Sequence, residues 1–562
     1  MNTELHENER IKARSNGLRG SLAAGIADEV SGALSPDDAQ LCKFHGFYEQ
    51  DDRDLRQERK DRFLEPYYSF MLRARLPGGV CTPRQWLAID DISRRLGNGS
   101  IRLTSRQTFQ FHGILKARLK PLIQEINAAL IDSIGGCGDI NRNVLCNPNP
   151  EQSDLHGQAY AWAKRLSEHL LPKSRAYHEI WLDGERVDGG QAEPLYGETY
   201  LPRKFKTAVA VPPHNDVDAY TNDLGFVAIA EEGELIGFNV LAGGGMGVTH
   251  GDVTTYARLA DELGFVRPEQ VLAVAEAVVA AQRDFGNRVS RRHARLKYTI
   301  DHMGVDAFRT EVEKRSGVTF RPPRPVRFTT QGDRYGWVEG ADGLGYLTLY
   351  VENGRVADGP EATPMRGLRE IAAVHTGDFR ITPNQNLVVA GIPAEHRETI
   401  EALAHAHGLL SKNHLPVRTA GIACVALPTC PQAMAEAERG FPEFLRRVEA
   451  LLLKHGLEDQ DPVIRMTGCP NGCARPFVAE IGLVGKAPGR YNLLLGGDGA
   501  GLRLARLYRE NISEDAIIEI LDGLFARFAR ERLETERLGA FTLRAGLIRP
   551  LQNPAEEFHV AA

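Results

Sequence analysis

Residues 99–114, GSIRLTSRQTFQFHGI, decide the fold, because residues 377–392, GDFRITPNQNLVVAGI, repeat their pattern. The two segments share Gly, Arg, Thr, Gln, Gly and Ile in register, which is six of sixteen positions at a separation of 278 residues. Composition alone gives about one such match. Each copy predicts a strand, a turn and a second strand, and each follows a helix-like run. The repeat therefore indicates an internally duplicated molecule with pseudo-twofold symmetry.

The duplication divides the chain into predicted regions of the α+β class. The two copies span residues 66–140 and 326–415, and each is followed by its own α/β domain, at 141–325 and 416–562. Residues 1–65 are charge-rich and lack a strand pattern, as in QDDRDLRQERKDR. We expect this N-terminal arm to be a solvated surface or a flexible segment, with docking of a partner as the alternative.

The composition excludes several classes of protein. The chain has 562 residues, 42% apolar and 25% charged, with a net charge of −6, so two to four globular domains are expected. This mild acidity argues against binding of nucleic acid, which favours a basic surface. No apolar run is long enough to span a bilayer, and the polar N-terminus, MNTELHENERIKARSNGLRG, does not resemble a secretory signal. We therefore expect a cytoplasmic protein.

Four of the eight cysteines form two close pairs. Cys424 and Cys430 have the spacing C-x5-C, and Cys469 and Cys473 have the spacing C-x3-C. Zinc knuckles typically use C-x2–4-C at both ends, so the first pair is too wide for that pattern. In a reducing compartment such clusters of cysteines indicate metal binding or redox activity. The spacing favours a cubane iron–sulfur cluster and leaves zinc, or buried or redox cysteines, as alternatives.

The surroundings of the four cysteines also suit negatively charged sulfur. Cys430 precedes Pro431 and a predicted long helix at 431–456, so its thiolate would lie at a helix N-terminus. The Pro-Asn-Gly turn between Cys469 and Cys473 exposes backbone N–H groups toward bound sulfur. The other four cysteines are scattered and are expected in the core: Cys42, Cys81, Cys137 and Cys146.

Basic residues form a second group of candidate functional side chains, besides the cysteines. They lie in apolar strand-like segments, where a buried charge needs a partner, and in loops punctuated by Gly, Asn and Pro. Lys204 and Lys206 alternate, so they share one strand face. Convergent cations predict an anionic ligand, either a small oxyanion, a polycarboxylate, or both. The set comprises Arg73, Arg75, Arg102, Arg106, Arg142, Arg203, Lys204 and Lys206.

The usual nucleotide-binding loops are missing from the sequence. Neither GGGMGV nor GGDGAG satisfies G-x-G-x-x-G, and no G-x-x-x-x-G-K-[ST] occurs. The chain is therefore not expected to bind NAD(P)H or ATP through these loops. If it is a reductase, its electrons come from elsewhere.

Several motifs together resemble those of the sulfite/nitrite reductase family. They are CVALPTCPQAMAEAER, MTGCPNGCARP, RLPGGV, NRNVLC and YLPRKFKT, and the likeness runs from about residue 44 to residue 550. Within the family the motifs are most similar to the haemoproteins of the assimilatory, NADPH-dependent branch. The resemblance implies paired ferredoxin-like half-domains and two α/β domains that hold sirohaem and an iron–sulfur cluster.

The resemblance also implies roles for individual residues. Cys424, Cys430, Cys469 and Cys473 would bind one 4Fe–4S cluster, and Cys473 would bridge it to the sirohaem iron. Sirohaem is rimmed by carboxylates, which explains the excess of basic residues. The implied sirohaem contacts are Arg102, Thr104, Arg106, Gln110, Arg203 and Asn471, with Gln385 and Asn386 from the second repeat, and His112 either there or in the core. The implied sulfite-binding and proton-relaying residues are Arg73, Arg142, Lys204 and Lys206.

The implied activity is the six-electron reduction of sulfite to sulfide. A flavoprotein reductase subunit that carries FAD and FMN and uses NADPH is the implied electron donor, with ferredoxin as the alternative. A sirohaem nitrite reductase uses the same fold and cofactors and is the closest alternative activity. A colourless structural zinc protein and a dissimilatory sulfite reductase are less consistent with the basic residues and with the absence of a further ferredoxin-like cysteine run.

Overall fold

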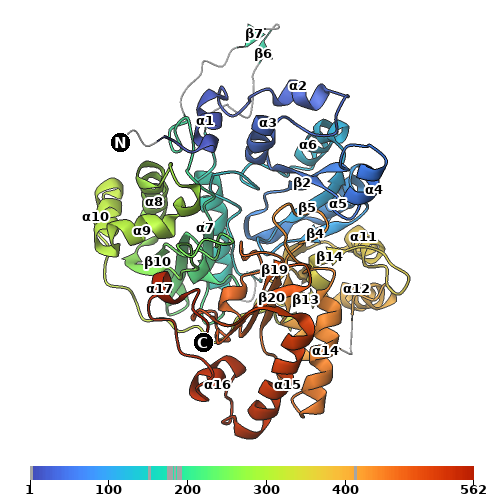
Figure 1. The fold of residues 1–562 in the computed structure, drawn as a ribbon, viewed down its shortest axis with the longest axis vertical. Coiled ribbons are helices and arrows are strands. Elements are labelled where there is room, and N and C mark those ends of the chain that lie inside the picture. The colour runs from blue at the N-terminus through green and yellow to red at the C-terminus, as the bar shows by residue number, and fades with distance from the viewer. Residues whose placement is uncertain (1–3, 150–152, 174–180, 183–184, 187–192, 411–413) are drawn as a thin grey trace.

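The computed structural model describes residues 4–149, 153–173, 181–182, 185–186, 193–410 and 414–562. Figure 1 shows the first α/β unit (green) beside the ferredoxin-like halves, and the second unit (orange and red) at the opposite end from the N-terminal helices. Within these residues, no helix is both long and apolar enough to cross a membrane.

The two halves of the repeat form two five-stranded sheets that exchange strands. The first sheet has the order β1-β2-β5-β4-β14 and the second the order β12-β13-β16-β15-β3, so each half contributes one short strand to the other's sheet. This reciprocal exchange confirms the predicted duplication and the α+β class. The strands of the first sheet are β1 (Phe47–Asp51), β2 (Tyr68–Arg73), β5 (Phe109–Ile114), β4 (Ile101–Leu103) and β14 (Arg355–Val356). Those of the second are β12 (Gly336–Glu339), β13 (Gly345–Leu349), β16 (Leu387–Ile392), β15 (Asp378–Ile381) and β3 (Val80–Cys81).

Helix α5 (Pro83–Leu96) joins the two halves through Trp86. The helix starts at a capping box between Thr82 and Gln85, which satisfies N–H groups that the first turn would leave unpaired. The fully buried Trp86 ring lies 5.6 Å from the ring of Phe109 in β5 and 4.9 Å from that of Phe379 in β15. One side chain thus packs against both copies of the repeat.

The two α/β units repeat one sheet pattern. In each, a parallel pair (β8·β9 or β18·β19) is continued by antiparallel strands, and one long helix follows: α8 (Val271–Phe285) or α15 (Glu514–Glu531). The first sheet comprises β8 (Thr207–Ala210), β9 (Leu224–Glu231), β10 (Glu234–Ala242) and β11 (Asp261–Val266). The second comprises β17 (Ile422–Ala423), β18 (Ile464–Thr467), β19 (Ile481–Ala487), β20 (Arg490–Leu495) and β21 (Arg506–Ser513).

The remaining elements cover these sheets or connect them. The short strands β6 (Trp181–Leu182) and β7 (Glu185–Arg186) pair with each other. The helices in this group are α2 (Leu22–Ala27), α6 (Leu119–Ala128), α7 (Asp154–His169), α9 (Leu296–Met303), α10 (Val305–Ser316), α11 (Pro364–Val374), α12 (Ala394–Ala406), α13 (Pro416–Thr419), α14 (Phe441–Lys454), α16 (Leu538–Arg544) and α17 (Pro554–Glu557).

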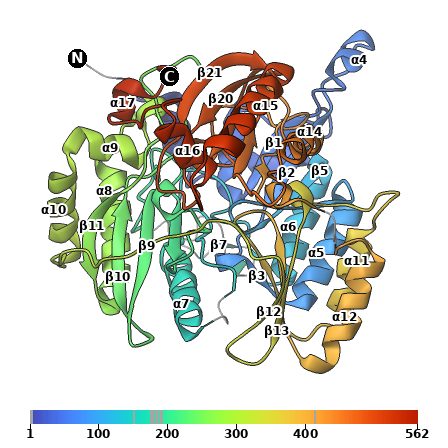
Figure 2. The same cartoon turned by 90° about the horizontal axis from the view of Figure 1, so that it is seen from below.

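The N-terminal region differs from the expected flexible arm. Helix α1 (Glu7–Arg14) buries Ile11 and Lys12, α3 (Pro36–Leu41) buries Leu41, and β1 pairs with β2 in the first sheet. Of the N-terminal helices that the structure describes, α1 to α4, only α4 (Arg56–Asp61) has no buried residue, and Figure 2 shows it protruding from the body. The charge-rich composition was misleading at α1, because its Glu9 and Lys12 form a buried ion pair. Docking of a partner on this region stays a prediction.

Candidate functional site

The four clustered cysteines lie on two loops that follow neighbouring parallel strands. Cys424 comes directly after β17, and the loop with Cys469 and Cys473 follows β18, which pairs with β17. Carboxyl ends of adjacent parallel strands meet at one sheet edge, where α/β proteins commonly place their sites. None of the four forms a disulfide; Cys469 is buried and Cys473 is exposed.

The four thiols share one electrostatic environment. Burial raises the pKa of Cys424 well above its ordinary value, and Cys473 and Cys469 add to the effect. Burial and Cys473 likewise raise the pKa of Cys469 to about 12. Backbone N–H groups oppose this, as Gly468 N does at 3.4 Å from Cys424 Sγ. Thiols in this setting become thiolates when a cation offsets their mutual repulsion, which is what ligation of a metal cluster provides.

The donor set fits a polynuclear cluster. In the part of the chain that the structure describes, no three His, Cys, Asp or Glu side chains gather closely enough to hold one metal ion. A cubane needs no such convergence, because each thiolate binds a different iron. Backbone and side-chain donors of Asn471 on Cys469, and the N–H groups of Gln432 and Ala433 on Cys430, supply the hydrogen bonds to sulfur that tune such clusters.

The predicted helix N-terminus at Cys430 is wrong. Helix α14 begins only at Phe441, with Pro442 in its first turn. Residues 431–440 form turns whose N–H groups bond to the cysteine loops: Met434 N donates to Gly468 O at 2.7 Å and Glu438 N to Cys424 O at 3.0 Å. Because these bonds replace the i to i+4 pattern, the thiol of Cys430 meets local N–H groups and not a helix dipole.

Lys204 and Lys206 precede β8 and lie half-buried near the cysteine loops. Neither ammonium group has a hydrogen-bond or ion-pair partner among the described residues. Burial and the neighbouring Arg203 lower the pKa of Lys204 to about 7. Burial and Lys204 lower the pKa of Lys206 well below its ordinary value. The thiolate of Cys473 acts against both shifts, so both ammonium groups lie within its electrostatic reach.

Arg73 and Arg142 complete the predicted quartet. Arg73 ends β2 opposite Gln110 of β5; with the Gln110 amide oriented so that its oxygen faces Arg73, that oxygen accepts from Arg73 Nε at 3.0 Å. Both guanidinium groups donate to Gly136 O, Arg73 at 3.3 Å and Arg142 at 3.0 Å. Burial lowers the pKa of Arg73, but Cys137, Tyr48, Cys473 and Cys430 together outweigh it and raise the pKa. Cys473 therefore raises the pKa of three of the four cations: Arg73, Lys204 and Lys206.

Arg102 has a carboxylate partner, whereas Arg106 has none among the described residues. Arg102 Nε lies 2.8 Å from Glu438 Oε2 without forming a hydrogen bond, and its NH2 donates to Ala423 O at 2.9 Å. Arg106 donates to Asn222 Oδ1 at 2.7 Å and to Thr207 O at 3.2 Å, but its buried Nε has no partner among the described residues. Burial and other cations, Arg475 first, lower the pKa of Arg106 to about 9.

The other predicted contacts surround the same region. Thr104 Oγ1 accepts from Arg106 N at 3.2 Å, and the half-buried Arg203 has its pKa lowered to about 10 by burial and Arg291. His112 is buried in β5; burial, Arg355 and Arg102 lower its pKa well below the ordinary value, so the ring is neutral. Gln385 adopts a left-handed φ of 72° and donates to Ala423 O at 2.9 Å, beside Cys424.

The first α/β unit also contacts the Cys469–Cys473 loop. Val248 N donates to Pro470 O at 3.0 Å, so the glycine-rich run GGGMGV lies directly against this turn. Gly472 has a φ of 62°, and a Cβ there would come within 3.0 Å of Met246 O. Glycine is therefore required both for the backbone conformation and for the close approach.

Sequence reasoning missed the acids that hold this site. Asp223 is fully buried; it accepts from Arg295 at 3.0 and 2.7 Å and from Lys206 N at 2.8 Å, so it anchors the backbone of a predicted site residue. Glu438 pairs with Arg102 and, at 2.7 Å, with Arg355. Glu438 lies inside the quoted motif AMAEAER and could have been found there, whereas TNDLG around Asp223 carries no recognisable signal.

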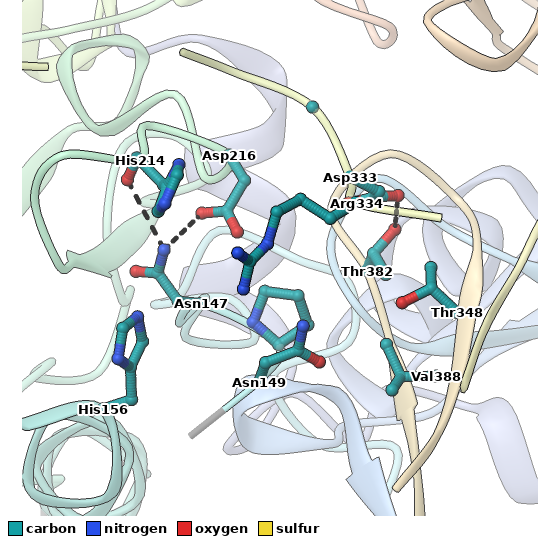
Figure 3. A pocket seen from close by; sticks show the side chains of 12 residues that line it. Asn147, Asn149, His156, His214, Asp216, Asp333, Arg334, Thr348, Thr382 and Val388 are labelled. Atoms are coloured by element: carbon teal, nitrogen blue, oxygen red, sulfur yellow. Dashed lines mark hydrogen bonds between the residues drawn. The ribbon is translucent and has the colours of Figure 1, made fainter. Parts of the chain in front are cut away.

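At the pseudo-symmetric position in the second half, only one of the three aligned residues is kept, an arginine. Across β2, β5 and β4 the register aligns Arg73, Gln110 and Arg102, and across β13, β16 and β15 the same positions are Thr348, Val388 and Arg380. A polar cavity of about 30 Å³ lies there (Figure 3), with room for little more than water. Its lining includes Asn147, Asn149, His156, His214, Asp216, Asp333, Arg334 and Thr382, and no cysteine.

Comparisons with known proteins agree with this architecture. The family model described as the nitrite/sulfite reductase ferredoxin-like half domain matches residues 64–129 and again 339–407. A second, the nitrite and sulphite reductase 4Fe-4S domain, matches residues 161–320. That range contains no cysteine, so this match lies on the first of the two repeated α/β units, while the clustered cysteines lie in the second.

Individual relatives cover the whole chain. A protein of Thiocapsa roseopersicina named NADPH sulfite reductase hemoprotein beta-component is 63% identical over 560 residues, 100% of both chains. One of the same name from Shewanella denitrificans is 60% identical over 99% of both chains. The solved structure of the Mycobacterium tuberculosis NirA protein has a TM-score of 0.78 at 23% identity and covers 96% of each chain, which establishes a shared fold.

Proposed function

The chain belongs to the nitrite and sulfite reductase family, and from this membership we propose that it catalyses the six-electron reduction of sulfite to sulfide. Full-length relatives at 63% and 60% identity bear the name of a sulfite reductase hemoprotein component. The observation that carries the proposal is the position of Cys473. It belongs to the four-thiol set, and it also raises the pKa of Arg73, Lys204 and Lys206.

The donor set indicates which residues would hold the cofactors. When bound, sirohaem and a 4Fe–4S cluster supply the electrons of the reaction in single steps. Cys424, Cys430, Cys469 and Cys473 would hold the cluster, and the exposed Cys473 would be shared with the sirohaem iron. The proposed sirohaem contacts are Arg102, Thr104, Arg106, Gln110, His112, Arg203, Gln385 and Asn471.

Within this set Arg106 is the strongest candidate for a sirohaem carboxylate, because no carboxylate pairs with it among the described residues. Its buried Nε also lacks a hydrogen bond there, and an unsatisfied buried donor costs about 1–3 kcal/mol unless a ligand accepts from it. Arg102 is already committed to Glu438 and to Ala423 O. We assign Arg102 mainly to orientation of the loop that carries Cys424.

The four basic residues of the quartet bind the substrate and supply protons. Lys204, Lys206, Arg73 and Arg142 bind the oxyanion: among the described residues no carboxylate pairs with them, and such cations favour an incoming anion. The oxygens of sulfite leave as water, so each S–O cleavage consumes protons. The pKa of Lys204, about 7, gives it both protonation states near neutrality and suits it to this supply.

Reduction of nitrite is the second candidate function, since the family description includes both substrates. Anaerobically purified protein with a reduced viologen dye as donor would decide between them without a partner subunit. We expect kcat/KM to favour sulfite, with sulfide as the product. A kcat/KM that favours nitrite would move the chain to the other activity.

The electron donor is proposed from the names of the relatives. Those names include NADPH, whereas this chain lacks the usual nucleotide-binding loops. We therefore propose that a flavoprotein subunit oxidises NADPH and passes the electrons to this chain.

A further inference from the structure

Helix α1 of the N-terminal region is connected to the segment that carries Arg203 and Lys204. Three consecutive carbonyl groups precede these residues, and each accepts a hydrogen bond from a different cation. Arg288 donates to Tyr200 O at 2.7 Å, Lys12 to Leu201 O at 2.9 Å, and Arg291 to Pro202 O at 3.2 Å.

Two carboxylates connect the three cations. Glu9 accepts from Lys12 at 2.6 Å and also pairs with Arg288. Asp139 binds Arg291 through both oxygens, at 2.8 and 3.0 Å, and lies 4.0 Å from Lys12. Lys12 stands at the centre of the network with a side chain that is 0% exposed, and those of Glu9 and Asp139 are each 3% exposed.

The network also reaches the segment that carries Arg142. Leu201 N donates to Asp139 O at 3.1 Å, Phe205 N to Ile140 O at 3.1 Å, and Arg142 N to Phe205 O at 2.8 Å. Residues 139–142 and 201–205 therefore lie side by side. The ion network contacts the N-terminal end of each segment, at Asp139 and at the carbonyls of residues 200–202. Three members of the proposed quartet extend from this pair of segments or directly after it.

We propose that Lys12 is a positioning residue for the oxyanion pocket: with Glu9 it fixes the carbonyl segment 200–202, and so the placement of Lys204, Lys206 and Arg142. Lys12 itself touches neither substrate nor cofactor. The inference rests on the proposed function of the basic quartet. It gives the N-terminal helix a role in substrate binding that is separate from the docking of an electron donor.

The test compares Lys12→Met with Arg14→Met in the full-length holoprotein. Arg14 is on the same helix, but its side chain is 53% exposed, and the acids that pair with it in the described part of the chain are Glu7 and Asp37. With dye as the donor, we expect Lys12→Met to raise KM for sulfite roughly tenfold or more, with a smaller change in kcat, because a shifted cation weakens substrate binding first. Lys12→Arg should recover part of the loss, and Arg14→Met should match the wild type.

Hydrogen–deuterium exchange provides a readout that does not depend on activity. Amides of residues 200–206 should exchange faster in Lys12→Met and remain as in the wild type in Arg14→Met. If Lys12→Met does not fold, Glu9→Gln replaces it with the same two readouts. Unchanged KM and unchanged exchange, or equal effects from Arg14→Met, would overturn the inference. A wild type that does not reduce sulfite would refute the proposed function instead, and the exchange comparison would still judge the positioning role.

Discussion

The guanidinium of Arg102 and the carboxylate of Glu438 form a buried ion pair, with 2.8 Å between Nε and Oε2. The pair joins β4 of the first ferredoxin-like half to the turns between Cys430 and α14. Arg102 also donates to Ala423 O, the carbonyl that precedes Cys424. One arginine thus positions both segments that border the first pair of cysteines.

Glu438→Gln should weaken this connection. Removal of one charge from a buried pair leaves the other without compensation and costs about 3–5 kcal/mol, so we expect the free energy of unfolding to fall by about 3 kcal/mol. Iron content should fall with it, because the loop that carries Cys424 and Cys430 loses its anchor. Denaturant unfolding and iron analysis measure the two effects. Glu443→Gln is the matched control, since Glu443 pairs with Arg446 at the surface of α14. Equal iron content in both variants would show that the pair does not support the cluster.

Lys206→Ala should reduce sulfite turnover while the sirohaem spectrum stays intact. Removal of one preorganised cation or donor typically costs about 10²–10³ in kcat. Lys314→Ala controls for loss of a surface ammonium, because the Lys314 side chain is 78% exposed. Steady-state assays with a dye donor measure the change. Turnover at the wild-type rate in Lys206→Ala would remove Lys206 from the mechanism.

Lys204 should make anion binding depend on pH near neutrality. Its pKa is lowered to about 7 by burial and Arg203, and a bound anion favours the charged ammonium and raises that pKa. Binding therefore takes up a proton above pH 7, and affinity should fall by up to about tenfold for each further pH unit. Nitrite is the suitable probe because it holds no proton in this range. Its KM should rise from about pH 7 to pH 9 in the wild type and stay flat in Lys204→Arg, whose guanidinium remains charged. Parallel profiles in the two proteins would assign the titration to another group.

The repeat at residues 99–114 and 377–392 predicted the duplicated architecture, because strand–turn–strand segments have local, periodic patterns. The exchange of β3 and β14 between the two sheets was not predictable, since pairing of short strands over such separations leaves no local signal. The helix expected from residue 431 begins only at Phe441, again because contacts distant in sequence decide the local structure. The stretch AMAEAER favours a helix locally, but the carbonyls of Gly468 and Cys424 capture its N–H groups.

The site was predictable where its chemistry is concentrated in motifs. The clustered cysteines and basic residues stand out by type and spacing, and in the structure Cys473 acts electrostatically on Arg73, Lys204 and Lys206 and raises the pKa of each. The supporting acids Asp139 and Asp223 were not predictable. Their roles depend on Arg291 and Arg295, which the fold brings to them from more than seventy residues away.

Cys473→Ser tests the central claim, that one thiol is shared by the cluster and the sirohaem. The direct measurement is electron paramagnetic resonance of the reduced protein, with Cys81→Ser, a buried cysteine in β3, as the matched control. We expect magnetic coupling between the two centres in the wild type and in Cys81→Ser, and its loss in Cys473→Ser together with loss of sulfite reduction. Coupling and activity that persist in Cys473→Ser would contradict the account.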